Sequence, residues 1–444
     1  MATGITKREQ MSTNATTAHS YAKESSPLPP VGAEARLAYP NKAPVSEIIH
    51  PVERKFVQLA DGNVSPCERL PRNSYILGDN YFALQSLLQQ REKVTLYYLD
   101  PPYGTGFDFQ SRNLEHAYED RLDAAAYIEF MRRRLILMRE TMSDNGSIYV
   151  HIGHQMLGHI KIVMDEIFGA NNFRNIITRK KCSSKNFTSK QYANLNDFIL
   201  FYSKSKKYKW NKPGATPDQD WIEKEYPKLD EYGRRYKLVP IHAPGTRNGE
   251  TGQPWKGMNP PPGKHWQYTP SKLDELDEAG DIHWSRNGNP RKKVYWRTGA
   301  KKSMTDYWDQ YRDAHHQSVK ITGYPTEKNL DMVKMIVEAS SDPGDLVVDP
   351  FCGSGTTMQA ARDLQRDYIG MDSSFASART ALSRLRFGSK PMGDYVTKAT
   401  KTEPDQAESI DSIDITSTLE ACSFTADSSL FDSYQDEMRG LSQI

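Results

Sequence analysis

The feature that most constrains this 444-residue chain is the alternation of short apolar segments with stretches that have helical spacing. Consecutive residues of the short segments are apolar, as in strands whose side chains are buried on both faces of a sheet. Strands that alternate with helices build parallel sheets, so we predict an α/β fold with a doubly wound, mainly parallel sheet. The predicted strands are 75–77, 94–99, 147–152, 346–348 and 368–371. The predicted helices are 124–142, 156–168 and 327–340.

The stretch from 173 to 325 interrupts this alternation. It is rich in Gly, Pro and Lys, and all seven tryptophans of the chain fall in it, so we interpret it as an inserted, irregular domain. Both ends of the chain are polar and lack a persistent period, which is typical of extended or disordered segments. The predicted organisation is an extended arm (1–71), one half of the α/β core (72–172), the insert (173–325), the other half of the core (326–390) and an acidic, disordered tail (391–444).

Composition excludes several classes of protein. Mean hydropathy is −0.72, and no apolar segment approaches the roughly 18 residues of a membrane-spanning helix, so we expect no association with a membrane. The four cysteines are far apart in the sequence, which argues against a disulfide framework and against a Cys-based zinc site. The N-terminus lacks the apolar core of a secretory signal. We therefore expect a cytoplasmic protein.

Charge is unevenly distributed, although the net charge is only +2. Residues 173–325 hold 29 Lys and Arg against 16 Asp and Glu, and residues 391–444 hold 3 against 11. A basic segment favours binding to a polyanion, because neutralising phosphates supplies most of the non-specific affinity for nucleic acids. The alternative is that charge simply varies along the surface of a long chain.

A short proline-rich loop follows the predicted strand 94–99. It consists of Asp100, Pro101, Pro102 and Tyr103. The two prolines restrict the backbone, so the loop presents a carboxylate, carbonyl groups and an aromatic ring in a rigid arrangement. Carboxylate and carbonyl oxygens can accept the two N–H bonds of an exocyclic amine, while the tyrosine stacks on the ring that carries it. A stiffened turn with a buried tyrosine is the structural alternative.

A glycine-containing loop, 349–357, follows the predicted strand 346–348. Gly353 and Gly355 allow the backbone to approach a ligand closely at a strand-to-helix turn. Asp372 ends the next predicted strand, where an acidic residue can accept hydrogen bonds from both hydroxyls of a ribose. The loop lacks the lysine of a triphosphate-binding loop and the third glycine of a dinucleotide site, which argues against both ligands.

Together the two loops resemble those of the amino-methyltransferases of DNA. Asp-Pro-Pro-Tyr is similar to their catalytic motif, and Phe-Cys-Gly-Ser-Gly-Thr is similar to their cofactor loop. The catalytic motif comes first and the insert lies between the two, which is the order of the β group of that family. The surrounding segments DPPYGTGFDF, DEIFG, FILFYSKS and GDIHWSRNGNPR are most similar to the modification subunits of type III restriction systems. The resemblance covers residues 72–390.

This resemblance implies a seven-stranded, Rossmann-like methyltransferase sheet with a catalytic half, a cofactor-binding half and a target-recognition insert. It implies S-adenosyl-L-methionine as methyl donor, double-stranded DNA as substrate and the N6 of adenine as acceptor, because the cytosine-N4 enzymes usually carry Ser in place of Asp100. It also implies a homodimer and a partnership with a restriction subunit. The alternatives are methylation of cytosine N4, of RNA or of a protein glutamine, and a DNA-binding module without catalysis.

No metal site is predicted. Direct methyl transfer to an amine needs no metal, and the histidine pairs (151 and 154, 315 and 316) lack ligand partners at suitable spacing.

Three groups of site residues are predicted. The catalytic residues are Asp100, Pro101, Pro102 and Tyr103. The cofactor-binding residues are Asp79, Asn80, Lys328, Asp349, Phe351, Gly353, Ser354, Gly355, Thr356 and Asp372. The residues predicted to contact DNA phosphates, taken from the basic clusters, are Arg179, Lys180, Lys181, Arg291, Lys292 and Lys293.

Overall fold

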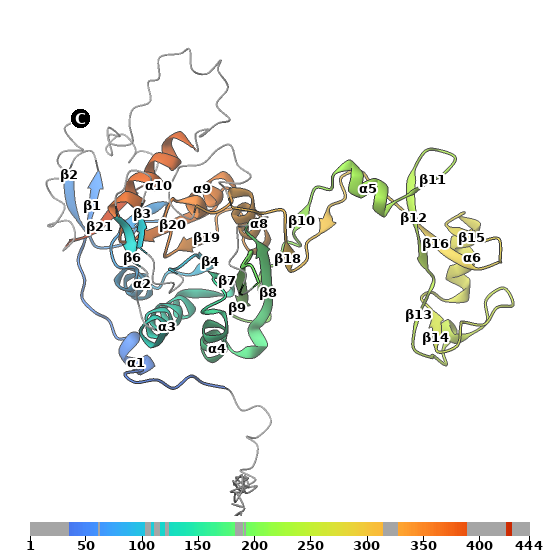
Figure 1. Ribbon diagram of the computed structural model, residues 1–444, viewed down its shortest axis with the longest axis horizontal. Coiled ribbons are helices and arrows are strands. Elements are labelled where there is room, and N and C mark those ends of the chain that lie inside the picture. Colours follow the sequence, from blue (N-terminus) through green and yellow to red (C-terminus); the bar gives the residue numbers. More distant parts are fainter. Residues whose placement is uncertain are drawn as a thin grey trace, which may run out of the picture.

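The computed structural model describes residues 35–60, 63–102, 108–110, 116–119, 124–182, 190, 192–313, 327–388 and 423–428. A mixed sheet of eleven strands organises the α/β part of these residues (Figure 1). In spatial order the strands are β18 (Tyr307–Trp308), β8 (Phe173–Lys180), β9 (Asn196–Ser203), β7 (Met142–Ile152), β4 (Val94–Leu99), β19 (Leu346–Asp349), β20 (Asp367–Asp372), β3 (Ser74–Leu77), β21 (Ser423–Asp427), β1 (Phe56–Ala60) and β2 (Asn63–Cys67).

The predicted α/β class and mainly parallel order are confirmed. Six of the ten neighbouring strand pairs in this sheet are parallel, and β9 is antiparallel to both of its neighbours. The sheet is longer than the seven strands that we expected. Seven strands, from β8 to β3, form the expected core, β18 extends one edge, and β21, β1 and β2 extend the other.

Helices cover both faces of the sheet. On one face α2, α3 and α4 pack with strand side chains such as Tyr97 and Leu99, and on the other α8, α9 and α10 pack with Leu96 and Tyr98. Because every side chain of β4 is buried, this strand is apolar without alternation. The helices are α2 (Asn80–Gln89), α3 (Ala124–Thr141), α4 (Leu157–Phe168), α8 (Leu330–Ser340), α9 (Thr356–Asp363) and α10 (Phe375–Phe387).

The N-terminal arm and the acidic tail both contribute to the sheet, so the expectation that they are wholly extended or disordered is wrong at these points. Strand β21 of the tail lies between β3 and β1 and pairs with both. Asp427 is buried in β21 and lies 2.7 Å from Arg54 of the arm. The arm also forms the short helix α1 (Val45–Ile48), whose Ile48 is buried against the core. These elements are only four or five residues long and lie in segments without a persistent period, so the sequence pattern did not reveal them.

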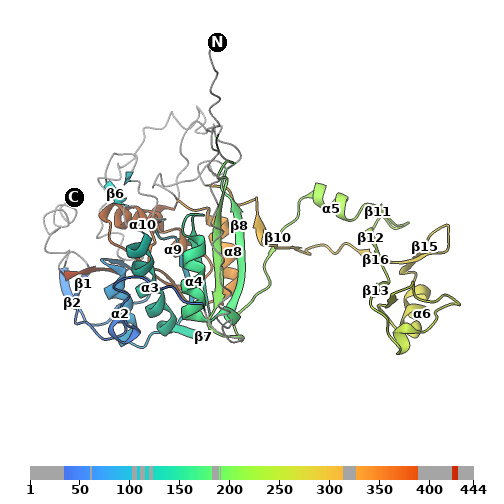
Figure 2. The ribbon, with the colours of Figure 1, turned by 60° about the horizontal axis from the view of Figure 1, so that its bottom comes forward.

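The insert forms a lobe that stands away from the sheet, as Figures 1 and 2 show. Strands β8 and β9 fall within 173–325 but belong to the main sheet, so the separate lobe is shorter than predicted. Its stalk is the antiparallel pair of β10 (Gly214–Ala215) and β17 (Lys302–Ser303). The other elements are α5 (Gln219–Glu225), β11 (Lys228–Leu229), β12 (Arg235–Pro240), β13 (His242–Pro244), η2 (Glu250–Gly252), β14 (Lys264–Trp266), α6 (Pro270–Glu278), β15 (Ile282–Trp284) and β16 (Pro290–Tyr295).

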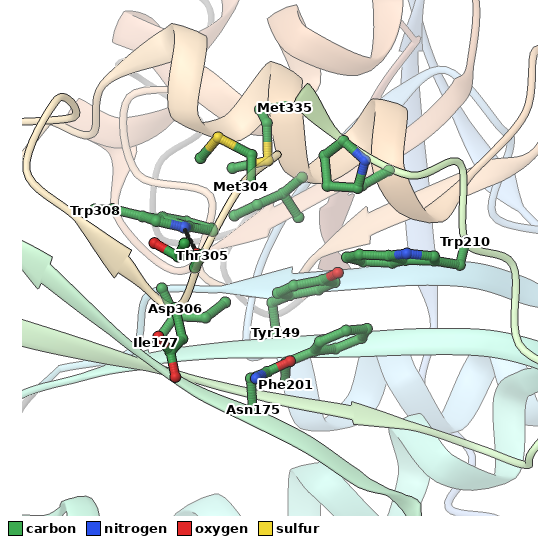
Figure 3. Close-up of a pocket in the computed structure, with 13 residues that line it drawn as sticks. Tyr149, Asn175, Ile177, Phe201, Trp210, Met304, Thr305, Asp306, Trp308 and Met335 are labelled. Atoms are coloured by element: carbon green, nitrogen blue, oxygen red, sulfur yellow. Dashed lines mark hydrogen bonds between the residues drawn. The ribbon is translucent and has the colours of Figure 1, made fainter. Parts of the chain in front are cut away.

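An apolar cavity of about 160 Å³ lies where the lobe joins the sheet (Figure 3). Its floor is formed by strands β7, β8 and β9, and its walls by α8 and the two chain segments that lead into and out of the lobe. Tyr149, Phe201 and Trp210 stack along one side, with ring centroids 4.3 and 5.8 Å apart. Trp308 is buried on another side. Among the residues that the structure describes, none of those predicted for catalysis or cofactor binding lines this cavity.

Candidate active site

Both predicted loops begin at the same edge of the sheet. Strands β4 and β19 are parallel neighbours, with Tyr97 opposite Val348, so the loops that follow them start side by side. In an open parallel sheet, ligands bind beyond the carboxyl ends of the strands. The motifs therefore meet in space although more than 240 residues separate Asp100 from Asp349 in the chain.

The carboxylate of Asp100 is held by a lysine from the other half of the core. Lys328 Nζ lies 2.5 Å from Asp100 Oδ2, and both side chains are mostly buried. The backbone of the same loop is fixed from α3, where the Tyr127 hydroxyl donates to the Pro102 carbonyl at 2.5 Å. Pro101 is buried. Tyr103 lies outside the described residues, and beyond it the chain forms the hairpin of β5 (Asp108–Gln110) and β6 (His116–Glu119).

Lys328, which was predicted to bind the cofactor, contacts the loop after β4 through its ion pair with Asp100. The preceding residue, Glu327, forms a buried ion pair with Arg384 of α10. Arg384 also donates to the hydroxyls of Thr356 and, at 3.3 Å, Ser354 in the cofactor loop. Two consecutive residues thus connect the cofactor loop to the catalytic carboxylate.

The cofactor loop is held by two carboxylates at the ends of neighbouring strands, of which Asp349 is buried and Asp372 is partly exposed. Asp349 accepts from the Thr357 hydroxyl at 2.5 Å and from the Phe351 backbone N–H at 3.0 Å. Asp372 accepts from the backbone N–H groups of Gly353, at 3.0 Å, and Ser374, at 2.9 Å. These bonds fix the path of the loop, and both carboxylates remain at the edge where a ligand would bind.

Ser354, Gly355 and Thr356 turn toward α10. Gly355 has a φ of +75°, and a Cβ added there would lie 2.8 Å from the Cβ of Ala381 in that helix. Glycine is therefore required at this position for the close packing of the loop on α10. Ser354 and Thr356 are buried and accept hydrogen bonds from Arg384 of that helix, which fixes the loop that is predicted to bind the cofactor.

The start of α2 is joined to the cofactor loop by Asn80, which is held in turn by an arginine that the sequence did not reveal. Asn80 donates from Nδ2 to the Pro350 carbonyl at 2.5 Å. The Arg134 guanidinium of α3 is 2.7 Å from Asp79 Oδ1, and its Nε donates to Asn80 Oδ1 at 2.5 Å. Arg134 is almost fully buried, whereas the helical pattern of 124–142 gave no reason to distinguish it from its neighbours Arg132 and Arg133.

The predicted phosphate-binding residues divide into three kinds. Arg179 is fully buried and lies 3.0 Å from Asp197 and 2.8 Å from Asp313, so the prediction that it contacts DNA is wrong. Lys180 and Lys181 are half-buried and follow at the end of β8, which runs parallel to β7 and so ends at the edge that carries Asp100. The remaining cluster, on β16 of the lobe, consists of Arg291, Lys292 and Lys293.

The described residues contain no group of three or more His, Cys, Asp or Glu side chains placed to hold a metal ion. Within the same residues, no helix has the length and apolar character needed to cross a membrane.

The fold and the paired loops define a class of enzyme that binds a nucleoside-containing cofactor beside a carboxylate. Comparison with known proteins makes this specific. Residues 94–382 match the family model described as DNA methylase, and the chain belongs to this family. It is 58% identical over 369 residues to the type II methyltransferase M.EcaI of Enterobacter cloacae, which covers 83% of this chain and 81% of that protein.

More distant relatives include the type III StyLTI Mod subunit of Salmonella typhimurium, 25% identical over 336 residues. That match covers 66% of this chain and 50% of the Mod subunit. Among solved structures, the M1.HpyAVI–SAM complex is similar over 70% of this chain and 98% of that one, with a TM-score of 0.40 and 16% identity. The family model and the relatives confirm the resemblance to β-group methyltransferases. The chain is a DNA methyltransferase of the restriction-modification type, with S-adenosyl-L-methionine as its cofactor.

The chemistry of the cofactor loop fits this donor. S-adenosyl-L-methionine carries a positive sulfonium sulfur, from which it supplies a methyl group to a nucleophile. Burial, together with the neighbouring carboxylates of Asp100 and Asp372, raises the pKa of Asp349 to about 7. Burial also raises the pKa of Asp372. A cation bound near this cluster would favour the ionised form of the carboxylates. The protein therefore provides negative charge that balances the positive sulfonium of the donor.

The binding of the cofactor should therefore release a proton. Below about pH 7 the free protein holds a proton on Asp349, and a bound cation lowers that pKa, so affinity should rise as pH rises toward about 7 and level off above it. Calorimetry near pH 6, in buffers with different ionisation enthalpies, measures the released proton. Asp349→Asn should bind without this release. Binding by the unaltered protein without proton release would contradict the placement of the cofactor beside Asp349.

Proposed function

We propose that this enzyme methylates the N6 amino group of adenine in double-stranded DNA. The observation that carries the proposal is the carboxylate of Asp100 at the edge of the sheet, fixed by Lys328 at 2.5 Å. A carboxylate is a strong acceptor for the N–H bonds of an exocyclic amine. Aspartate at this position is typical of the adenine enzymes that the motif resembles.

In the proposed reaction the target base leaves the duplex, because its amino group is paired and stacked there; unstacking costs a few kcal/mol. Asp100 and the Pro101 carbonyl accept the two N–H bonds, which directs the nitrogen lone pair away from them. Tyr103 stacks on the base. Lys328 prevents the carboxylate from rotating, so the main contribution of the protein is to position the amine for in-line attack.

The cofactor is proposed to lie against the loop after β19. Asp372 and Asp349 provide negative charge, the backbone of Gly353 allows close approach, and Asp79 and Phe351 border the same edge. Asn80, Ser354, Gly355, Thr356 and Lys328 shape the loop through the contacts described above.

DNA is proposed to bind along the edge that holds Lys180 and Lys181 and on the lobe that holds Arg291, Lys292 and Lys293. Replacing both Lys180 and Lys181 by Gln should weaken binding to all sequences equally, and should flatten the dependence of log affinity on log salt by about 0.9 per lost phosphate contact. Fluorescence anisotropy at several salt concentrations measures this slope.

The matched control removes the same charge from the opposite edge of the sheet. Lys206 and Lys207 follow β9, which runs antiparallel to β8, and both are exposed. If replacing Lys206 and Lys207 by Gln flattened the slope as much as the change at Lys180 and Lys181, general charge would be responsible and the proposed path of DNA would be wrong.

The choice of base is tested by mass spectrometry of nucleosides from DNA that the purified enzyme has methylated with an isotopically labelled donor. The proposal predicts labelled N6-methyladenine. Labelled N4-methylcytosine would contradict it and would favour the alternative target, whose exocyclic amine could be held by the same carboxylate.

We also propose that the enzyme acts as a homodimer in the bacterial cytosol and works beside a restriction subunit. The β-group resemblance supports the dimer, and the Mod subunits among the relatives support the partnership. The chain spans about half the length of those subunits. Light scattering of the purified protein should give twice the monomer mass; a monomer at micromolar concentration would contradict the dimer.

A further inference from the structure

The tight turn that joins β11 to β12 in the lobe is organised by one carboxylate (Figure 1). Asp230 accepts hydrogen bonds from the backbone N–H groups of Tyr232, at 3.0 Å, and Arg234, at 2.8 Å. Its second carboxylate oxygen accepts from Arg234 Nε at 2.7 Å. Gly233, with a φ of +74°, donates its N–H to the Asp230 carbonyl at 3.0 Å and closes the turn. The turn therefore fixes both the backbone and the Nε of Arg234.

The guanidinium of Arg234 also lies over two tyrosine rings. Its carbon is 4.5 Å from the ring centroid of Tyr295, in β16, and 5.4 Å from that of Tyr232. Such contacts hold the plane of a guanidinium against an aromatic face. The side chain is nevertheless 59% exposed, and its two terminal nitrogens form no hydrogen bond with any residue that the structure describes. The lobe thus presents a planar pair of donors that is fixed at Nε and accessible from solvent.

The lobe sheet has one face toward the apolar core of the lobe. Side chains of a strand alternate between the two faces, and residues that are direct partners across strands share a face. Lys292 of β16 is the partner of Ile282, which is buried in the lobe core, and Lys292 donates to the Tyr268 hydroxyl at 3.0 Å. Lys292 therefore lies on the face that packs on the core.

Arg234 belongs to the opposite face. Arg291, Lys293 and Tyr295 alternate with Lys292 along β16, so all three lie on the face away from the lobe core. The Arg234 guanidinium packs on Tyr295 and so extends this row. One face of the lobe sheet therefore combines two cations with a fixed guanidinium.

The chemistry of this guanidinium fits the edge of a guanine. In the major groove guanine presents two acceptors, N7 and O6, whereas adenine presents one acceptor and one donor. The planar donors of an arginine can reach both acceptors of guanine at once. A phosphate also accepts two hydrogen bonds, but the Asp230 carboxylate, 2.7 Å from Nε, would repel its negative charge. The uncharged edge of a base carries no such penalty.

We propose that Arg234 reads a guanine of the recognition sequence in the major groove, and that Asp230 is the residue that positions it. The proposal rests on the proposed binding of DNA to the lobe. Arg291 and Lys293, on the same face, contact phosphates beside that guanine. Phosphate contacts fix the register of a protein on the duplex, and base contacts supply the sequence information.

Methylation of a library of random duplexes by the purified enzyme, followed by modified-base sequencing, tests this role. The recurring site of the unaltered enzyme should contain a G·C pair. In Arg234→Ala the preference for guanine at one such pair, or at its symmetric copy as well in a palindrome, should fall about 10- to 100-fold. The other positions of the site and the cofactor affinity should be unchanged. A site without any G·C pair, or an unaltered preference in Arg234→Ala, would overturn the proposal.

Two variants separate reading of a base from general charge. Arg234→Lys keeps the charge without the planar donors, so it should retain the salt dependence of binding but lose most of the preference for guanine. Arg286→Ala removes an exposed arginine from the turn between β15 and β16 and should keep the site unaltered. Equal weakening of all sequences by Arg234→Ala, with a salt slope lower by about 0.9, would reveal a phosphate contact and overturn the proposal.

A double-mutant cycle tests the role of Asp230. Asp230→Asn weakens the hold on Arg234 Nε, so it should reduce the preference for guanine by less than Arg234→Ala does. In a chain that already carries Arg234→Ala, adding Asp230→Asn should leave base preference unchanged, because there is no guanidinium left to position. A further change in that background would overturn the positioning role.

The proposed function can fail separately from this inference. If removal of residues 216–301 left the recurring site unchanged, the proposed binding of DNA to the lobe would be wrong. If removal abolished the site while Arg234→Ala retained it, the lobe would read DNA through other residues and the role of Arg234 would be refuted. Labelled N4-methylcytosine would refute the proposed target base, while a loss of guanine preference in Arg234→Ala would still support the reading of guanine.

Discussion

Replacing Asp100 by Ala should reduce methyl transfer by about 1,000-fold, the effect of removing one group that stabilises a transition state. Two losses combine in this variant. The target amine loses its acceptor, and the Lys328 ammonium, 2.5 Å from the carboxylate in the unaltered protein, is left to face the amine. An ammonium there repels the positive charge that develops on the nitrogen during attack. Single-turnover kinetics with radiolabelled donor measures the loss.

Two further variants isolate the cause. Asp100→Asn keeps an accepting oxygen without the charge, so its rate should lie between those of Asp100→Ala and the unaltered enzyme. Asp144→Ala, at a carboxylate whose side chain is 99% exposed, should change nothing. Near-normal turnover by Asp100→Ala would show that the amine is held elsewhere.

Removal of the lobe should abolish site selectivity while the core stays folded. Ala215 and Lys302 are direct partners in the stalk, so residues 216–301 can be replaced by a two-residue Asn-Gly turn without changing the strands on either side. Specific binding usually exceeds non-specific binding by at least about 1,000-fold, and this is the affinity that we expect to be lost.

The shortened enzyme also provides its own control. The cofactor loop, Asp100 and Lys328 all lie in the core, so cofactor affinity and the thermal unfolding midpoint of the core should be retained. Sequencing of the methylated positions should show scattered modification in place of a recurring site. If the recurring site persisted, recognition would lie in the core or in the N-terminal arm.

The core of the fold could be predicted because burial acts on every side chain of its central strands. Strands β4 and β19 are buried along their whole length, and each ends at a loop whose residue types are unusual. By contrast, β1, β2 and β21 are strands of five residues at one end of the sheet, and such short segments leave little trace in side-chain patterns. The pairing of β21 with β3 joins segments about 350 residues apart, which no local period can signal.

The residues of the candidate site also fall into those that the sequence predicts and those that it does not. The loops that contain Asp100 and Asp349 are local motifs and were recognised as such. The contacts of Lys328 and Arg134 depend on which elements pack together in space, and their residue types alone suggest only surface charge. Arg179 shows the opposite error: its sequence neighbours are basic, but its position on β8 faces Asp197 across the sheet and buries it.

The most direct test of the account is modified-base sequencing of DNA from methylation-deficient cells that express this chain, beside cells that express Asp100→Ala. We expect N6-methyladenine at one recurring sequence in the first sample and at no recurring sequence in the second. N4-methylcytosine, or the same pattern of modification in both samples, would contradict the account.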